Sequence, residues 1–542
     1  MHDEMSRRAA RLMNALTAAK PTLSRRDVLA AAMALAGSAL LPGSLLAAGR
    51  FDPRSPRFTA YPFSLGVASG YPRADRVTLW TRLAPEPLRG DGGMWPDVVH
   101  LDWEVAEDEH FAQIAQKGSV RAAPELAHSA HITVRGLQPA HTYFYRFICG
   151  EAVSRTGRTR TLPALDASPE RFRLAFGSCQ HFEQAWFSAH RHAVADDIDL
   201  MVFLGDYIYE SNWGDELVRR HVGGEANSLE SYRVRHAQYK TDADLQNSHA
   251  AIPWAYTWDD HEVDNDYAGD QSEHLDPAFL IRRAAAYQAF YEHQPMPLEM
   301  HPRGPDMRIY TELDIGRLAR IHIVDNRQYR SPQPCPSDYK GGGSTDVQPK
   351  DCAMVAEPSQ TMLGSEQEAW LDRSFAQSPA QWNLIAQQTL LAKFDGAPGP
   401  ERMVWTDGWD AFPAARNRLL HSLRQHKLRN PVILGGDIHA TVIADVHADS
   451  ENMDSPIVAA ELCGTSVGSQ GWLPEVFNVR LPENPHVHYG DSSKRGYIVL
   501  DLDRKRCAAD LRVLADEKRP DTTASTAARF LVENGRPGVR KA

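Results

Sequence analysis

Residues 200–210, LMVFLGDYIYE, place five consecutive apolar side chains directly before Gly205 and Asp206. A short apolar run of this kind predicts a strand buried in a parallel sheet, with its last residues at the edge where ligands of α/β sheets bind. Tyr209 follows Asp206 by three residues, and a turn there can bring the carboxylate and the phenol to one point. Such an oxygen pair suits a hard cation. The alternative is an ordinary Gly-Asp turn above a packed tyrosine, and the other strand ends of the chain decide between the two.

The preceding predicted strand also ends in a side chain that can bind a metal. Residues 172–177, FRLAFG, run into Cys179, and a helix expected at 187–195 completes a βαβ unit with the strand before Asp206. We therefore expect Cys179 and Asp206 at neighbouring strand ends. An inert buried thiol is the commoner explanation for such a cysteine, and a metal-binding thiolate or a nucleophile is the alternative.

An acidic loop follows the aromatic run at 256–258. Its sequence, DDHEVDND at 259–266, contains Asp260, His261 and Asn265, whose side chains are suited to metal binding or acid/base chemistry. A solvated acidic loop is the alternative. The loop has neither the sixth-position glycine nor the closing glutamate of an EF-hand, which excludes that type of calcium site.

A further strand, expected at 430–434, ends in Asp437 and His439. These residues repeat the Gly-Asp pattern and add a histidine that can face the same crevice. A lone GDxH motif is weak evidence, but this is the fourth segment of the chain with metal-capable side chains at such a place. The sequence therefore predicts a metal centre at the carboxyl ends of the strands.

Arginines accompany this set of strands. The strand predicted at 319–324 leads into Arg327 and Arg330, and Arg308 lies in a strand-like segment. Arginine at such positions binds phosphate or carboxylate through two parallel hydrogen bonds. A structural ion pair with the acidic loop explains the same residues equally well.

The composition is that of an ordinary globular protein with room for two or three domains. The chain has 542 residues, of which 42% are hydrophobic and 24% are charged. Its formal net charge of -11 gives no basic footprint, so no nucleic-acid-binding surface is predicted.

The first residues predict export. Arg25 and Arg26 precede an apolar run at 28–41, and small residues follow at Ala47 and Ala48. The run is too short for a membrane span, so residues 1–48 are interpreted as a twin-arginine signal peptide and no stable membrane insertion is expected. The partner would be the twin-arginine export machinery, and the protein would be periplasmic or secreted. An amphipathic or anchoring N-terminal helix is the alternative.

Export implies an oxidising compartment, which bears on the cysteines. Cys335 and Cys352 bracket a polar loop and are a plausible disulfide, although the pairing does not follow from the sequence. Cys149, Cys463 and Cys507 have apolar or strand-like surroundings and are interpreted as buried thiols.

Short alternating runs between residues 63 and 162 predict a small all-β sandwich of immunoglobulin or fibronectin type over residues 49–162. Within it, residues 137–139, LQP, followed by Tyr143 resemble a tyrosine corner, in which the phenol bonds to upstream backbone. No catalytic set is visible in this domain, and residues 163–169 would be its linker.

Taken in order, the motifs resemble those of the PhoD-type alkaline phosphatases, within the calcineurin-like metallophosphoesterase superfamily. The matching segments are SCQ at 178–180, GDYIY at 205–209, WDDHEVDN at 258–265, VDNRQYR at 324–330, GSEQEAWL at 364–371 and GGDIHA at 435–440. The resemblance spans nearly the whole mature chain. It implies a four-layer αββα metallophosphoesterase-like core over residues 170–517.

The same resemblance implies a site that holds Fe³⁺ and Ca²⁺. Cys179 and Tyr209 would bind iron, and Asp206 would bridge the metals. The remaining ligands implied by the motifs are Asn265, Asp437 and His439.

Three further residues are implied in catalysis. Asp260 or His261 would act as ligand, acid or orienting group, and Arg308, whose flanking sequence matches loosely, would contact phosphate. The reaction would be hydrolysis of small-molecule phosphate esters, mono- or diesters, by water activated on the metals, without a phosphoenzyme.

Alternatives within and outside this class stay open at this point. They are a phospholipase D-like phosphodiesterase, a non-catalytic exported metal-binding protein and a redox enzyme that uses the iron. In the tail at 518–542 a helix is expected over 526–533, and in related enzymes a terminal helix can cover the site, so a lid is a hypothesis.

Overall fold

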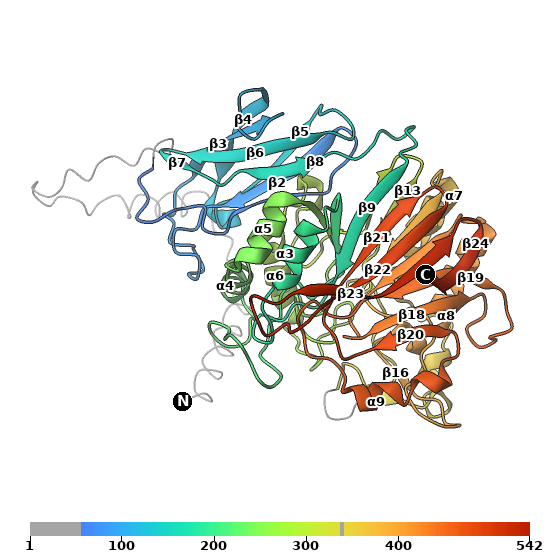
Figure 1. Cartoon of the computed structure of the whole chain (residues 1–542). Coiled ribbons are helices and arrows are strands. Elements are labelled where there is room, and N and C mark those ends of the chain that lie inside the picture. Colours follow the sequence, from blue (N-terminus) through green and yellow to red (C-terminus); the bar gives the residue numbers. More distant parts are fainter. Residues whose placement is uncertain (1–55, 337–340) are drawn as a thin grey trace, which may run out of the picture. The chain divides into compact units, whose positions relative to one another are not determined.

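The computed structural model describes residues 56–336 and 341–542 (Figure 1). The predicted signal peptide lies outside these residues. The apolar run before Gly205 forms strand β10 (Leu200–Phe203), which pairs in parallel with β9 (Arg171–Gly177) and β11 (Pro253–Tyr256). Helix α3 (Ser188–Ala195) connects β9 to β10. The predicted βαβ unit is therefore present, with the carboxyl ends of its strands side by side.

These strands form the middle of a sheet that has ten strands in the order β24-β23-β22-β21-β9-β10-β11-β1-β2-β5. The flanking strands are β1 (Val67–Gly70), β2 (Arg76–Arg82), β5 (Ser129–Arg135), β21 (Gly496–Asp503), β22 (Arg506–Leu514), β23 (Ala524–Glu533) and β24 (Arg536–Lys541). Because β1 pairs in parallel with β11, strands from before and after the linker predicted at 163–169 share one sheet. The domain limits drawn from the sequence stay a prediction.

A five-stranded sheet packs on the β1, β2 and β5 end of that sheet. It contains β3 (Val99–Ala106), β4 (Ile114–Ala122), β6 (Thr142–Cys149), β7 (Ala152–Val153) and β8 (Gly157–Arg160). Val77 and Leu79 of β2 share a buried cluster with Leu101 and Phe147 of this sheet. The hydroxyl of Tyr143 accepts a hydrogen bond of 2.9 Å from the backbone N–H of Gln138, which is the predicted tyrosine corner.

The helix and lid predicted in the tail are wrong, because residues 526–533 belong to strand β23. Ala528, Phe530 and Val532 are buried while their neighbours face outward, a period of two that suits a strand. The strand pairs with β22 on one side and β24 on the other. Alanine and glutamate favour helix, but burial of every second side chain against the sheet outweighs that preference.

The second large sheet has seven strands in the order β12-β13-β15-β17-β19-β18-β20. They are β12 (Thr311–Ile315), β13 (Ala319–Ile323), β15 (Trp382–Ala386), β17 (Pro431–Gly435), β18 (Thr441–His447), β19 (Ile457–Cys463) and β20 (Val487–Asp491). A small ribbon pairs β14 (Asp346–Val347) with β16 (Val404–Trp405).

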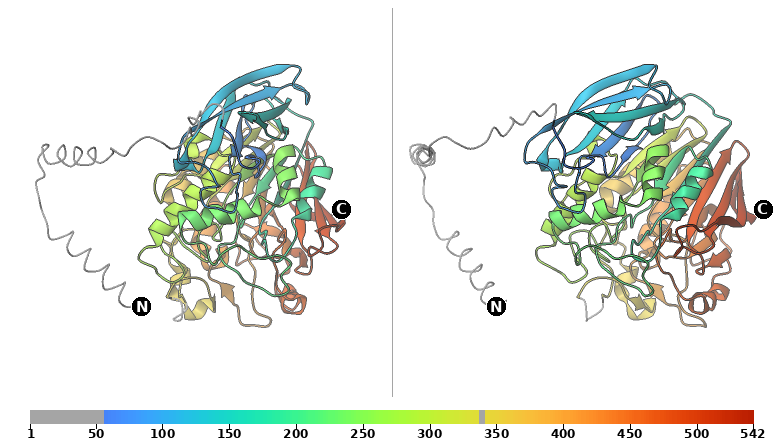
Figure 2. Two further views of the ribbon diagram at one scale, coloured as in Figure 1. Left: turned by 90° about the vertical axis from the view of Figure 1, so that its left-hand side faces the viewer. Right: turned by 60° about the vertical axis from the view of Figure 1, so that its left-hand side comes forward.

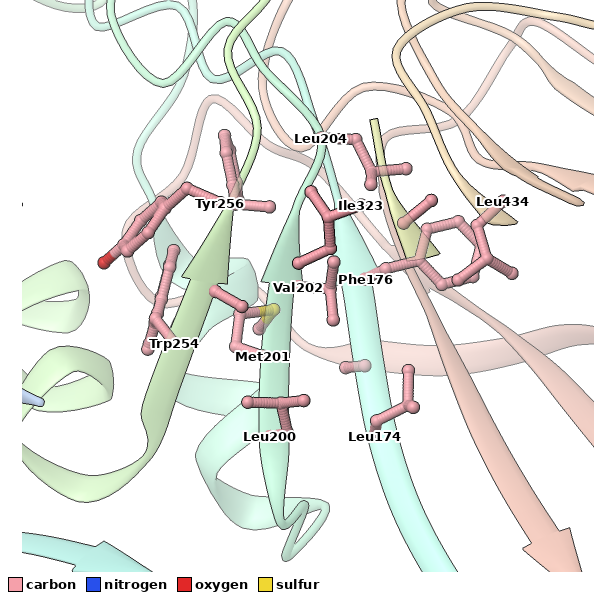
Figure 3. Close-up of a cluster of buried hydrophobic side chains, with 14 of the residues drawn as sticks. Leu174, Phe176, Leu200, Met201, Val202, Leu204, Trp254, Tyr256, Ile323 and Leu434 are labelled. Atoms are coloured by element: carbon pink, nitrogen blue, oxygen red, sulfur yellow. The ribbon is translucent and has the colours of Figure 1, made fainter. Parts of the chain in front are cut away.

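Side-chain alternation shows what covers each face of this sheet. Leu384 and Leu434 belong to the same buried cluster as Phe176 of the ten-stranded sheet, so the two sheets pack on each other. Figure 3 shows Leu434 and Ile323 beside Phe176. Ile385 and Ile433, which point to the other face of the sheet, belong instead to a buried cluster with helices α7 (Gly364–Gln377) and α8 (Pro413–Gln425).

A second group of helices packs on the ten-stranded sheet. It comprises α3 together with α4 (Leu229–Tyr239), α5 (Ala243–Ala251) and α6 (Phe279–His293), drawn mainly in green in Figure 2. A short α9 (Pro474–Asn478) precedes β20. In the described ranges, no helix combines the length and the apolar character that crossing a membrane requires.

The structure agrees with the predictions for the following five cysteines. Cys335 and Cys352 form a disulfide with a Cα–Cα distance of 6.1 Å. Cys149, Cys463 and Cys507 are free and buried.

Glu461 on β19 is a fully buried carboxylate whose two oxygens accept the backbone N–H groups of Leu391 and Ala392. Burial raises its pKa to about 7, although these hydrogen bonds and Arg416 act in the opposite direction. The folded protein therefore holds a proton at pH values where the unfolded chain has released it. This group's contribution to stability is present below about pH 4.5 and is lost as the pH rises through 7.

Replacement of Glu461 by glutamine is expected to remove this pH dependence. The free energy of unfolding of the wild type should fall relative to that of Glu461→Gln by about 3 kcal/mol between pH 4.5 and pH 8, in line with about 1.4 kcal/mol for each pKa unit. Urea unfolding at several pH values measures the difference. Glu475→Gln, at an exposed site, is the control and should show a constant difference. A constant difference for Glu461→Gln as well would contradict the raised pKa.

Candidate metal centre

Four predicted ligands stand just beyond the ends of β9, β10 and β17, and all four have an unusual backbone. The φ angles are 60° at Cys179, 54° at Asp206, 67° at Asp437 and 52° at His439. Non-glycine residues rarely adopt this left-handed conformation, which costs about 1–3 kcal/mol and is concentrated at functional sites. The chain thus turns sharply after each strand and directs these side chains to one place.

Gly205 makes the turn before Asp206 possible. Its φ is 112°, and a Cβ atom there would lie 2.5 Å from the backbone nitrogen of Asp259. Only glycine lets the β10 end and the acidic loop approach so closely. Glu262 of that loop then accepts hydrogen bonds from the backbone N–H groups of Asp206 and Asp259, which fixes the two segments together.

One group of donors combines sulfur, nitrogen and oxygen. Ligand atoms of Cys179, Asp206 and His439 lie within 4.8 Å of one another. The hydroxyl of Tyr209 is 3.0 Å from Asp206 Oδ2 and 3.1 Å from His439 Nε2. A thiol, a phenol, an imidazole and a carboxylate together form a donor set for a transition metal rather than for magnesium or calcium alone.

The protonation states in this group fit the same conclusion. Burial and the neighbouring Asp206 carboxylate raise the pKa of the Cys179 thiol and of the Tyr209 phenol well above their usual values. A coordinated cation is the agent that deprotonates such groups. Burial lowers the pKa of His439 to about 3, so its imidazole is neutral and able to act as a ligand.

A second group of donors consists of oxygen atoms. Carboxylates of Asp206, Asp259 and Asp437 lie within 4.8 Å of one another, and Asp206 also forms such a group with Asp260 and His261. Asp206 therefore belongs to three groups, as a bridging ligand would.

Buried carboxylate oxygens in this group lack partners. Among the described residues, Oδ1 of Asp206 and Oδ2 of Asp437 accept no hydrogen bond. Unpaired buried carboxylates cost several kcal/mol, and burial raises the pKa of Asp437 to about 7. A bound cation would remove this cost, so the residues fit a metal pair.

His261 lies against the cluster without joining the sulfur-containing group. Its Nδ1 is 2.7 Å from Glu210 Oε2, and its ring centroid is 4.2 Å from that of Tyr209. Burial alone would lower the pKa of His261, but Glu210, Asp260 and Asp206 outweigh it and raise that pKa well above its usual value. These contacts suit a proton donor or an orienting group, and the donor group with Asp206 and Asp260 suits a ligand, so the role of His261 stays a prediction.

Two predicted site residues have other surroundings. The Asn265 amide donates a hydrogen bond of 3.1 Å to Glu273, and Asn265 and His261 line one open pocket of about 540 Å³. Arg308 is exposed and lies 4.3 Å above the ring of Tyr310. Within the described ranges no hydrogen bond or ion pair joins Arg308 to the cluster, so its contact with phosphate stays a prediction.

Arg327 forms the ion pair with the acidic loop that was one of its two predicted roles. Its buried guanidinium pairs with Asp259, with Asp260 at 3.6 Å and with Asp407 at 2.6 Å. It is thus a structural partner of the acidic loop. Asp407 is also paired with Arg330 at 3.0 Å. Sequence reasoning missed Asp259 as a ligand candidate and Asp407 altogether, and the second lies in a loop without any strand signal.

Comparison with known proteins agrees with this geometry. The sequence model of the PhoD-like phosphatases matches residues 174–511, and that of the PhoD-like phosphatase N-terminal domain matches residues 48–163. The chain is 40% identical to alkaline phosphatase D of Bacillus subtilis (strain 168) over 532 residues, which covers 96% of this chain and 89% of the relative. A solved structure described as "Structure of PhoD" has a TM-score of 0.85 at 41% identity and covers 90% of this chain and 93% of its own. The chain therefore belongs to the PhoD-like phosphatase family and is a phosphate ester hydrolase.

Proposed function

We propose that this protein is an exported, metal-dependent alkaline phosphatase that acts on phosphate monoesters, diesters or both, with Fe³⁺ and Ca²⁺ as its metals. The observation that carries the proposal is the position of Asp206, which belongs to three donor groups and keeps one buried oxygen without a partner among the described residues. A carboxylate so placed would serve two cations at once. Hydrolysis of small-molecule phosphate esters follows from the family.

The two kinds of donor divide between the two metals. Cys179, Tyr209 and His439 would hold the iron, since thiolate and phenolate donate charge and stabilise the ferric state. The hard oxygen donors would hold calcium, which prefers carboxylate and amide oxygens. Those donors are Asp259, Asp437 and, by its motif, Asn265. Asp206 would serve both.

Bound metals would polarise the phosphoryl group and lower the pKa of water. The chain supplies the remaining parts of the reaction. Glu210 holds the His261 imidazole at 2.7 Å, so that a proton is available beside the cluster for the leaving alkoxide. Asp437 and His439, like His261 and Asn265, are partly exposed, so substrate would approach from the side of these residues, whereas Cys179 and Tyr209 are buried away from water.

The proposal of export rests on the paired arginines and the apolar run of the first 48 residues. The disulfide between Cys335 and Cys352 supports an oxidising compartment, the periplasm or the exterior, reached through the twin-arginine machinery. We also infer that the packed layers correspond to the four-layer αββα core of metallophosphoesterases, with an immunoglobulin-like sandwich before it. The alternation of side chains on β15 supports that assignment.

Metal analysis of protein exported in its natural compartment tests the proposed metals. We expect about one iron per chain together with calcium, because one sulfur-containing donor group is present beside the oxygen donors. Removal of calcium by a selective chelator should lower hydrolysis of a panel of mono- and diesters by at least about 10-fold, and calcium should restore it. Zinc, or no metal, in place of iron would contradict the assignment of Cys179 and Tyr209.

A further inference from the structure

A narrow aromatic pocket opens beside the loop that carries Asp437 and His439. Its volume is about 60 Å³, and its walls include Ile438, Phe394, Trp405 and Trp472. We refer to this pocket, which Asp410 also lines, as the aromatic pocket. Ile438 stands between the two metal-ligand candidates in the sequence and is half-buried, so one wall of the pocket is part of the metal-binding loop itself.

Trp472 is held at a fixed place relative to the metal centre. The carbonyl oxygen of Gln470 is 2.5 Å from His439 Nδ1, and the hydroxyl of Ser469 donates a hydrogen bond of 2.9 Å to that of Tyr209. At Gly471 a Cβ atom would lie 2.5 Å from the carbonyl oxygen of His439. The segment before Trp472 is thus packed directly on two predicted iron ligands, and the tryptophan follows at once.

The ring of Trp472 remains accessible. Its exposed fraction is 37%, although a tryptophan of this kind buries a large apolar area when a partner covers it. The guanidinium of Arg480 lies 5.0 Å above one face, and the ring of Phe477 is 6.1 Å away at an edge-on angle. These contacts hold the ring in place and leave part of its surface toward the pocket.

A second pocket beside the metal centre has a different character. The open pocket beside His261 is polar, because carboxylates such as Glu210 and Glu273 line it together with Arg282, which pairs with other acidic residues of the same lining. In the aromatic pocket most of the walls are apolar or aromatic, and Asp410 is paired with Arg416 at 2.7 Å. An apolar group attached to a phosphate at the metal centre would therefore be stabilised in the aromatic pocket and not in the polar one.

We propose that the organic group of the substrate packs on the exposed ring of Trp472 at the aromatic pocket, and that the enzyme prefers phosphate esters of apolar, ring-bearing or alkyl alcohols over esters of small polar alcohols. The inference rests on the proposed function, since it needs the phosphate at the metal centre. The contact is non-directional apolar burial, so it adds to binding of the ester and of its transition state alike.

Trp472→Ala tests the inference with two substrates, ethyl phosphate and 2-phenylethyl phosphate. Their leaving alcohols are alike in acidity and differ in the ring. We expect the wild type to prefer the phenylethyl ester, and the variant to lose about 10- to 50-fold in kcat/KM for that ester, mainly through KM, because about 1.4–2.3 kcal/mol of apolar contact is removed. The value for ethyl phosphate should change less than about 3-fold. Trp472→Phe should keep most of the preference.

Two further variants make the result specific. Trp405→Ala removes another wall of the aromatic pocket and is expected to act in the same direction. Leu473→Ala alters a neighbouring side chain that is 62% exposed and outside the pocket walls, and it should leave the ratio of the two esters unchanged. An equal loss for both esters in Trp472→Ala, or no loss in either pocket variant, overturns the inference.

Binding separates this inference from the proposed function. If neither ester is hydrolysed by the wild type, the proposed function fails. Calorimetry with ethylphosphonate and 2-phenylethylphosphonate on the metal-loaded full chain still tests whether the aromatic pocket binds the organic group. Tighter binding of the phenylethyl compound that disappears in Trp472→Ala supports the subsite. Equal affinities overturn it.

Discussion

Replacing Asp206 with asparagine is expected to lower kcat/KM for phosphate esters by more than about 10³-fold and to remove the bound metals. Loss of one electrostatic donor costs 10²–10³ in other hydrolases, and loss of an outer-shell partner alone costs 10- to 100-fold in metal affinity. Asp206 takes part in three donor groups at once, so its charge would serve both proposed metals. Steady-state kinetics and metal analysis on the same preparation measure the two effects together.

Asparagine at this position changes the charge and little else. It has the same shape, tolerates the left-handed φ of 54°, and its amide oxygen can still accept the hydrogen bond from Tyr209. Asp197→Asn is a matched control, because Asp197 is exposed and has a φ of 50° outside the cluster. That variant should keep full activity and metal content. Retention of both by Asp206→Asn would rule out a bridging role.

The sequence placed Cys179, Asp206 and His439 near one another because each comes shortly after an apolar strand. The buried strands β9, β10 and β17 are visible as runs of apolar residues, and the residues directly after such a run must lie at the sheet edge. Cys179, Asp206 and His439 therefore meet as predicted. Arg308 shows the limit of the same reasoning: its segment has a strand-like pattern, but β12 begins only at Thr311, and the side chain is exposed.

Features that depend on distant parts of the chain were not visible in the sequence. Asp407 reaches Arg327 only because two loops from different parts of the fold close on each other, and its own segment carries no periodic signal. The parallel pairing of β1 with β11 was likewise not predictable, because many other strands of the chain are equally apolar and could have paired with β11. In β23 the local helix preference of alanine suggested a helix, whereas the partner strand β22 decided the outcome.

Replacing Arg327 with methionine is expected to lower the free energy of unfolding of the metal-free protein by about 3–5 kcal/mol, because it leaves buried carboxylates without their counter-charge. The side chain of Arg327 is 2% exposed and pairs with Asp259, Asp260 and Asp407. Urea unfolding in the presence of a chelator measures the loss without a contribution from the metals. Arg512→Met, which breaks the more exposed pair with Asp196 at 2.9 Å, should cost less than about 1 kcal/mol.

The pH dependence of that loss identifies its cause. Burial raises the pKa of Asp260 and of Asp407, but Arg327 outweighs it and holds both below their usual values. Without the guanidinium these pKa values rise, and the folded variant then takes up protons that the unfolded chain has released. The deficit of Arg327→Met should therefore be largest at pH 8 and shrink toward pH 5. Adding Asp407→Asn should recover part of the stability at pH 8, since one repelling charge is gone. A deficit that is the same at every pH, with no recovery in the double variant, would mean that lost packing and not lost charge is responsible.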